Sequence, residues 1–142
     1  MYWWRDTASA TVALQEMIAT PAAKLLYDHT LLSGSKFTTT GIPGELHLPG
    51  YSFCGPGTNL NKRLDEAANP KPWSKPKNTV DEVCMRHDID YENSTTLEEK
   101  HEADREMLYY FSLIRNPTFR EKNDRFIMKK MISAKLRPGL GK

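Results

Sequence analysis

The stretch "CMRHDIDYENSTTLEEKHEAD", Cys84 to Asp104, decides how this chain folds. Apolar or small side chains lie within this stretch and just before it, at spacings of three and four residues that are typical of one helix face. These positions are Val80, Val83, Cys84 and Tyr91, with His87 on the same stripe. "NSTT" at 93–96 breaks the pattern, and Thr96 with Glu99 makes a capping box for a second helix. We therefore predict two antiparallel helices joined by a short turn.

His87 and Asp104 lie at equal distances from that turn, one on each predicted helix. Asp104 interrupts a mostly apolar stripe, where a buried carboxylate needs a partner. A facing histidine supplies one, and an Asp–His pair fixes the tautomer of the ring and makes it a better base. The pattern is compatible with a catalytic pair or with a structural ion pair.

Composition and length limit the classes of protein that remain. The 142 residues suggest one domain, with or without appended arms, and a composition of 39% hydrophobic and 27% charged residues is typical of a globular protein. No apolar run approaches the ~18 residues of a membrane span. The N-terminus lacks the pattern of a secretory signal, so a virion component or a piece of a longer chain is expected.

The net charge of +2 hides two segments of opposite sign. Residues 79–107 carry ten acids against three bases, whereas residues 115–142 carry nine bases against two acids. The acidic segment suits a divalent cation, and the basic tail suits anionic lipid or nucleic acid. A solvated helix face is the plain alternative for each.

The remaining elements follow from turn and cap signals. Residues 6–32 are expected to be helical, residues 33–50 to be rich in turns, and the proline-rich residues 62–78 to form a surface loop. Asn78 or Thr79 caps the helix that carries His87. Thr118 with Glu121 caps a basic helix that runs to about residue 136. The fold is thus mostly α with no sizeable sheet.

The segment "YSFCGPG" at 51–57 is a possible source of cation ligands. Calcium takes about six to eight oxygens from carboxylates and carbonyls, and a glycine-rich loop can turn several carbonyls toward one point. Asp88 follows His87 and points about 100° away around the helix. Cys54 and Cys84 are compatible with two free thiols or one disulfide, which would fix the loop one turn before Asp88.

These motifs together resemble the phospholipase A2 superfamily. "HDIDY" matches its His-Asp-x-x-Tyr helix, "YSFCGPG" its calcium loop, and "EAD" at 102–104 the site of its second aspartate. The order of the motifs, including "PKNTVD" at 76–81, is similar to the branch in parvovirus minor capsid proteins. Cys54 and Cys84 instead resemble a disulfide of the secreted branch. The resemblance implies two antiparallel helices with the His/Asp site and a glycine-rich calcium loop.

The resemblance also implies a reaction and a role for each site residue. The enzyme would hydrolyse the sn-2 ester of glycerophospholipids and release fatty acid and lysophospholipid. His87 would activate water, Asp104 would hold the other ring nitrogen, and Tyr91 would hydrogen-bond Asp104. Calcium would be the cofactor. Its ligands would be the Asp88 carboxylate and the carbonyls of Phe53, Gly55 and Gly57.

The resemblance covers roughly residues 48–107, and it departs from the family at several points. The proline-rich loop is longer than expected, and the connection from His87 to Asp104 leaves no room for the β-wing of the secreted branch. We therefore predict three parts: an N-terminal helical extension at 1–45, a catalytic core at 46–116, and a basic helix and tail at 117–142.

Three other functions compete with phospholipase activity. They are a non-catalytic calcium- or lipid-binding module of the same fold, a transition-metal site that includes His101, and an adaptor that binds through its basic tail. For the enzyme we expect a monomeric domain that acts on a membrane surface, in a secreted, extracellular or virion setting. Candidates for its apolar rim are Tyr2, Trp3, Trp4, Leu46 and Leu48.

Overall fold

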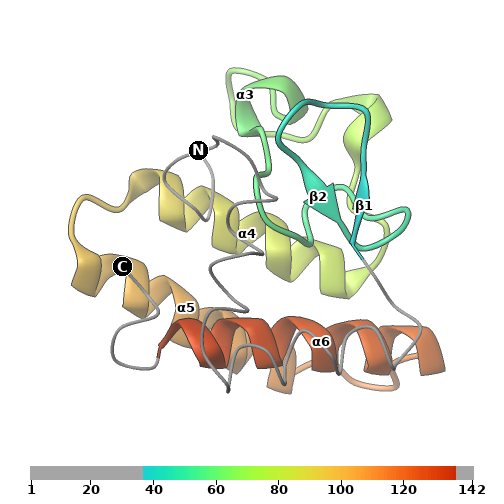
Figure 1. Cartoon of the computed structure of the whole chain (residues 1–142), viewed down its shortest axis with the longest axis vertical. Coiled ribbons are helices and arrows are strands. Elements are labelled where there is room, and N and C mark those ends of the chain that lie inside the picture. The colour runs from blue at the N-terminus through green and yellow to red at the C-terminus, as the bar shows by residue number, and fades with distance from the viewer. Residues whose placement is uncertain (1–36, 137–142) are drawn as a thin grey trace.

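The computed structural model describes residues 37–136, which form a mostly helical fold (Figure 1). The strands and short helices come first: β1 (Thr38–Thr39), β2 (Leu46–His47), α3 (Leu60–Arg63) and the 3₁₀ helix η1 (Pro72–Ser74). The long helices follow: α4 (Thr79–Asn93), α5 (Leu97–Ser112) and α6 (Phe119–Lys135). The prediction of a mostly α fold without a sizeable sheet is confirmed. The helix expected over 6–32 lies outside the described residues.

The long helices begin where the capping signals predict. The Asn78 side chain accepts the Asp81 N–H at 3.0 Å and starts α4. Thr96 and Glu99 form the reciprocal capping box that starts α5. A capping box also starts α6. The Thr118 N–H donates to the Glu121 carboxylate, and the Glu121 N–H donates to the Thr118 hydroxyl. Each cap satisfies N–H groups that have no partner inside the helix.

The core lies between α4, α5 and α6 and extends to the segment that follows β2. In Figure 1 the two-stranded sheet and α3 lie on one side of α4, and α5 and α6 lie on the other. Residues that are at most 2% exposed come from every part of this arrangement: Leu48, Phe53, Val80, Cys84, Met107, Phe111, Ile127, Met128 and Ile132. The helix pair α4–α5 is therefore held from both sides.

The basic helix α6 is tied to the glycine-rich segment as well as to the core. The buried Asp124 accepts a hydrogen bond from the Tyr51 hydroxyl at 2.6 Å, and that hydroxyl accepts one from Asn78 at 2.8 Å. The Tyr51 hydroxyl thus links the inner face of α6 to the start of α4. The proposed boundaries of the three parts stay a prediction.

The proline-rich residues 62–78 are not simply the surface loop that was predicted. Arg63 and Ser74 are buried, and the Ser74 hydroxyl donates to the Arg63 carbonyl at 2.6 Å. The guanidinium of Arg63 is buried because it pairs with Glu45, a contact that the local sequence does not reveal. Trp73, at 60% exposed, shows that the outer side of this segment does face solvent.

Between residues 37 and 136, no helix has the length and apolar character needed to cross a membrane.

Candidate active site

The two antiparallel helices bring His87 and Asp104 together as predicted. His87 Nε2 and Asp104 Oδ1 are 2.6 Å apart, and neither side chain is more than 1% exposed. Because a carboxylate oxygen can only accept, Nε2 carries the hydrogen in this contact. Nδ1 is then the basic nitrogen of the neutral ring. The contact therefore fixes one tautomer of His87.

Asp88 and Tyr91 complete the immediate surroundings of the His87 ring. Asp88 Oδ1 lies 3.7 Å from His87 Nδ1, and the Asp88 side chain is 1% exposed. The Tyr91 ring centroid lies 5.0 Å from that of His87. Burial, together with the charge of Asp104, raises the pKa of the Tyr91 hydroxyl well above its usual range. Tyr91 is therefore a neutral phenol beside the pair, and its hydrogen bond to Asp104 stays a prediction.

The glycine-rich loop after β2 has backbone geometry that requires its glycines. Gly55 has φ +148°, and a Cβ there would lie 2.1 Å from the Leu46 carbonyl oxygen. Gly57 has φ +81°, in the region that side chains rarely adopt. Phe53, Gly55 and Gly57 are all buried. Close packing of this loop against β2 therefore leaves no room for a side chain at Gly55.

A disulfide joins this loop to α4. Cys54 and Cys84 are bonded, with their Cα atoms 5.1 Å apart. The predicted disulfide is thus present, and it is placed one helical turn before His87 and Asp88. The disulfide therefore holds the glycine-rich loop against α4, the helix that carries Asp88.

Asp81 is a second anchor of the loop, a role that the sequence did not predict for it. Its Oδ1 accepts the N–H groups of Phe53 and Cys54 at 2.8 and 3.2 Å. Its Oδ2 accepts those of Ser52 and Lys77, both at 2.8 Å. Burial raises the pKa of this carboxyl, and the four N–H donors oppose that effect. The sequence signal that could have indicated this role is the position of Asp81 at the end of "PKNTVD", in the first turn of α4.

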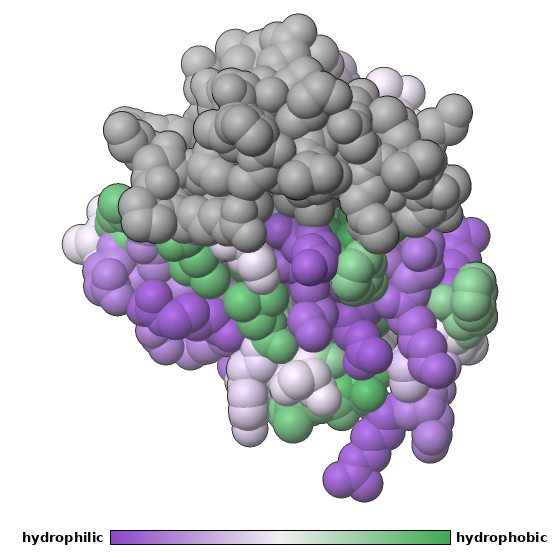
Figure 2. All heavy atoms as spheres, turned by 60° about the horizontal axis from the view of Figure 1, so that its bottom comes forward, coloured by the Kyte–Doolittle hydropathy of each residue, from purple (hydrophilic) through white to green (hydrophobic). Residues whose placement is uncertain are grey.

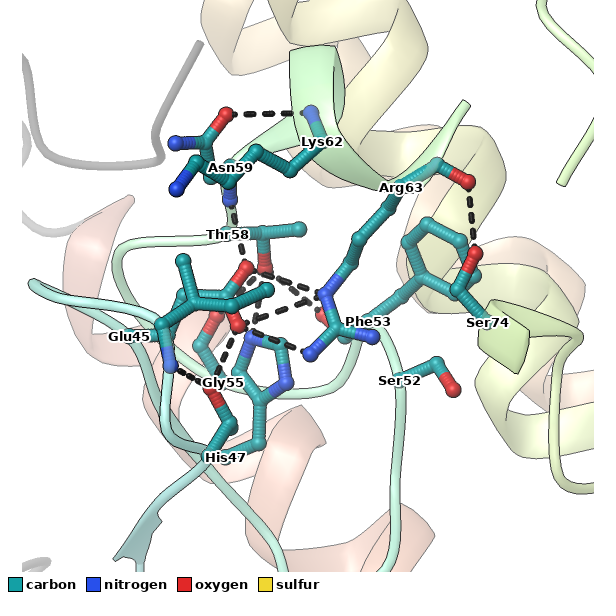
Figure 3. Close-up of polar contacts among 12 residues, drawn as sticks. Glu45, His47, Ser52, Phe53, Gly55, Thr58, Asn59, Lys62, Arg63 and Ser74 are labelled. Carbon is teal, nitrogen blue, oxygen red and sulfur yellow. Dashed lines mark hydrogen bonds and ion pairs between the residues drawn. The ribbon is translucent and has the colours of Figure 1, made fainter. Parts of the chain in front are cut away.

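A buried polar cluster lies against the glycine-rich loop (Figure 3). Glu45 accepts two close hydrogen bonds from Arg63, at 2.8 and 2.9 Å, and one from the Asn59 N–H at 2.7 Å. Burial disfavours the Glu45 charge, but these donors outweigh it and hold the pKa of Glu45 below its usual value. Sequence reasoning missed this pair, because neither residue stands on a periodic stripe.

His47 belongs to the same cluster. Its Nε2 lies 2.8 Å from the Thr58 hydroxyl, and its Nδ1 lies 3.2 Å from the Tyr51 carbonyl oxygen. Burial lowers the pKa of His47 to about 4, with the charge of Arg63 acting in the same direction. His47 is therefore a neutral histidine inside the protein at ordinary pH.

The structure contradicts one predicted residue of the apolar rim and tests one alternative metal site. Leu48 is fully buried, so its assignment to an exposed apolar rim is wrong. Tyr2, Trp3 and Trp4 lie outside the described residues. His101 was a candidate for a transition-metal site with His87 and Asp104. Within residues 37–136, however, no three His, Cys, Asp or Glu side chains are grouped so that they could hold a metal ion.

Comparison with known proteins agrees with this arrangement. The family model described as "Phospholipase A2-like domain" matches residues 44–137, which extends beyond the segment on which the resemblance was based. No curated protein and no solved structure matches the chain. The matched region contains the glycine loop, the disulfide and all three long helices. The chain belongs to the family of phospholipase A2-like domains, of the type found in parvovirus minor capsid proteins.

Proposed function

We propose that this domain is a calcium-dependent phospholipase A2 that hydrolyses the sn-2 ester of glycerophospholipids. The observation that carries the proposal is the contact of 2.6 Å between His87 Nε2 and Asp104 Oδ1. Both groups are buried, and both come from helices whose hairpin geometry fixes them. A histidine held in one tautomer by a buried carboxylate is suited to general-base chemistry.

The reaction follows from the positions of the two ring nitrogens. His87 Nδ1 takes a proton from a water molecule whose oxygen attacks the ester carbonyl carbon. Asp104 stabilises the imidazolium that forms. The proton then passes to the glycerol oxygen as the ester C–O bond breaks, which yields a fatty acid and a lysophospholipid. No acyl-enzyme is required, because water is the nucleophile.

The donor set around the glycine loop fits calcium. The proposed ligands are the Asp88 carboxylate and the backbone carbonyls of Phe53, Gly55 and Gly57, and oxygen is the ligand that calcium prefers. Asp88 is 1% exposed and lies one turn from the disulfide that holds the loop. Such a set contains one carboxylate, and its other ligands are backbone oxygens. When bound, the ion would polarise the ester carbonyl and hold the lipid phosphate.

The test is calcium-dependent release of fatty acid from phospholipid vesicles. Wild-type protein should release the sn-2 fatty acid with calcium and not with a chelator. His87→Gln should abolish release yet bind calcium nearly as well, and Asp88→Asn should lose both. Wild-type turnover in His87→Gln would contradict the mechanism. Calcium binding without any release by wild-type protein would instead indicate the non-catalytic module.

Membrane contact belongs to the same proposal, in a virion or extracellular setting. The outer face of α6 carries Lys122, Phe126, Lys129 and Lys130, all exposed, and Phe119 is 88% exposed. On the face that Figure 2 turns toward the viewer, hydrophilic and hydrophobic side chains are interspersed. Lysines beside aromatic rings suit the surface of an anionic membrane. The wild-type protein should bind anionic vesicles in a salt-dependent way, and the Lys129→Glu/Lys130→Glu variant should bind them more weakly. Equal binding by the variant and the wild type would contradict this role of α6.

A further inference from the structure

The hydroxyl group of Thr58 lies among three possible hydrogen-bond partners (Figure 3). Its oxygen is 2.8 Å from His47 Nε2, 3.2 Å from the Phe53 carbonyl oxygen and 3.3 Å from the Gly55 carbonyl oxygen. Thr58 is fully buried. The last two partners are carbonyls that the proposed function assigns to calcium. A hydroxyl has one hydrogen, so only one partner can receive it fully.

The His47 ring decides which partner receives that hydrogen. Nδ1 lies 3.2 Å from the Tyr51 carbonyl oxygen, which can only accept, so Nδ1 carries a hydrogen. His47 is 1% exposed, and its ring nitrogens face one carbonyl oxygen and one hydroxyl, so in the neutral ring Nε2 has a lone pair and accepts the Thr58 hydrogen. This is also the shortest of the three contacts. The Phe53 and Gly55 carbonyl oxygens therefore do not receive the Thr58 hydrogen.

We propose that His47 is a positioning residue that keeps the Phe53 and Gly55 carbonyls available to calcium by accepting the Thr58 hydrogen. The inference rests on the proposed calcium site. Without an acceptor at position 47, the Thr58 hydrogen would turn to one of the two carbonyls, where it would compete with the cation. His47 thus acts on the ion through Thr58, without touching it.

Three variants of the full chain test this by calorimetric titration with calcium chloride. His47→Asn keeps a donor for the Tyr51 carbonyl and removes the acceptor for Thr58, so calcium affinity should fall about tenfold, the worth of one hydrogen bond. Thr58→Val removes the competing hydrogen, so affinity should stay within about threefold of wild type. In the double variant, affinity should return toward that of Thr58→Val. Melting temperatures in chelator report the structural cost of each change separately.

The rescue in the double variant distinguishes positioning from mere support of the fold. A structural role would make the two losses add, whereas the proposal requires that Thr58→Val repair the loss caused by His47→Asn. Equal calcium affinity in wild type and His47→Asn would overturn the proposal. So would a loss of tenfold or more in folded Thr58→Val, which remains measurable even if His47→Asn fails to fold.

The same titration separates this inference from the proposed function. If wild type binds calcium and releases fatty acid while His47→Asn binds calcium equally well, only the positioning role fails. If the wild-type protein binds no calcium, the proposed calcium site and the positioning role of His47 both fail.

Discussion

Asp81 Oδ1 accepts the Phe53 N–H at 2.8 Å, so the first helical turn of α4 holds the backbone of the glycine loop. The same carboxylate accepts three further N–H groups. It therefore fixes the N–H side of a loop whose carbonyl side is proposed to bind calcium. Two independent links, this carboxylate and the disulfide, set the loop against the helix that carries His87 and Asp88.

Asp81→Asn should destabilise the fold and weaken calcium binding. An amide places an N–H₂ group against backbone donors, so at least two charge-assisted hydrogen bonds are lost, a cost of about 3 kcal/mol. Urea unfolding and calcium titration measure the two effects. Asp90→Asn is the matched control, because its partner Arg86 lies 3.9 Å away in an exposed ion pair worth less than about 1 kcal/mol. Equal stability of Asp81→Asn and wild type would contradict the anchoring role.

Removal of the disulfide should lower stability and calcium affinity together. Cys54 and Cys84 are 30 residues apart, and opening a loop of that length costs about 3 to 4 kcal/mol in the chain-entropy model. The Cys54→Ala/Cys84→Ala variant, unfolded in urea, gives the first quantity, and calcium titration gives the second. Unchanged calcium affinity in a folded double variant would show that the loop keeps its position without the disulfide.

Asp104→Asn should lower turnover and leave calcium binding nearly intact. The amide cannot stabilise the imidazolium of His87 as a carboxylate does, and it allows the wrong tautomer. We expect kcat to fall about 10² to 10⁴-fold. Steady-state hydrolysis of vesicles and calcium titration give the two readouts. A loss of calcium affinity as large as the loss of kcat would mean that the substitution disturbs the whole site.

The helix hairpin and the His87–Asp104 pair could be predicted because their signals are local. Helical spacing, the Asn78 cap and the Thr96–Glu99 capping box fix both helices within a few residues. The short turn between them then fixes which residues face each other. The disulfide followed from the family resemblance, since spacing alone left two free thiols open.

The supports of the glycine loop could not be predicted, because their contacts are distant and follow no period. Asp81 reaches Ser52 across 29 residues, and His47 reaches Thr58 across 11. Glu45 and Arg63 stand in segments rich in turns or prolines, where a charged residue normally predicts solvent exposure. Their burial depends on a pairing across 18 residues, which no local pattern encodes.

Stability should fall as pH drops from about 6.5 to about 4, because His47 is neutral inside the fold. Its folded pKa lies below its unfolded pKa, so protons favour the unfolded chain throughout this window. The stability that neutral His47 contributes is fully present above pH 6.5, and about 3 kcal/mol of it is lost near pH 4. Urea unfolding in chelator across this range measures it.

The His47→Asn variant should flatten this part of the stability curve, although the variant is less stable at neutral pH. Arg63 strengthens the effect, since its charge opposes a second cation in the cluster, and Glu45 weakens it. His101→Asn is the matched histidine variant, because it leaves the cluster in place. A slope that is equal in wild type and His47→Asn would place the titrating group elsewhere.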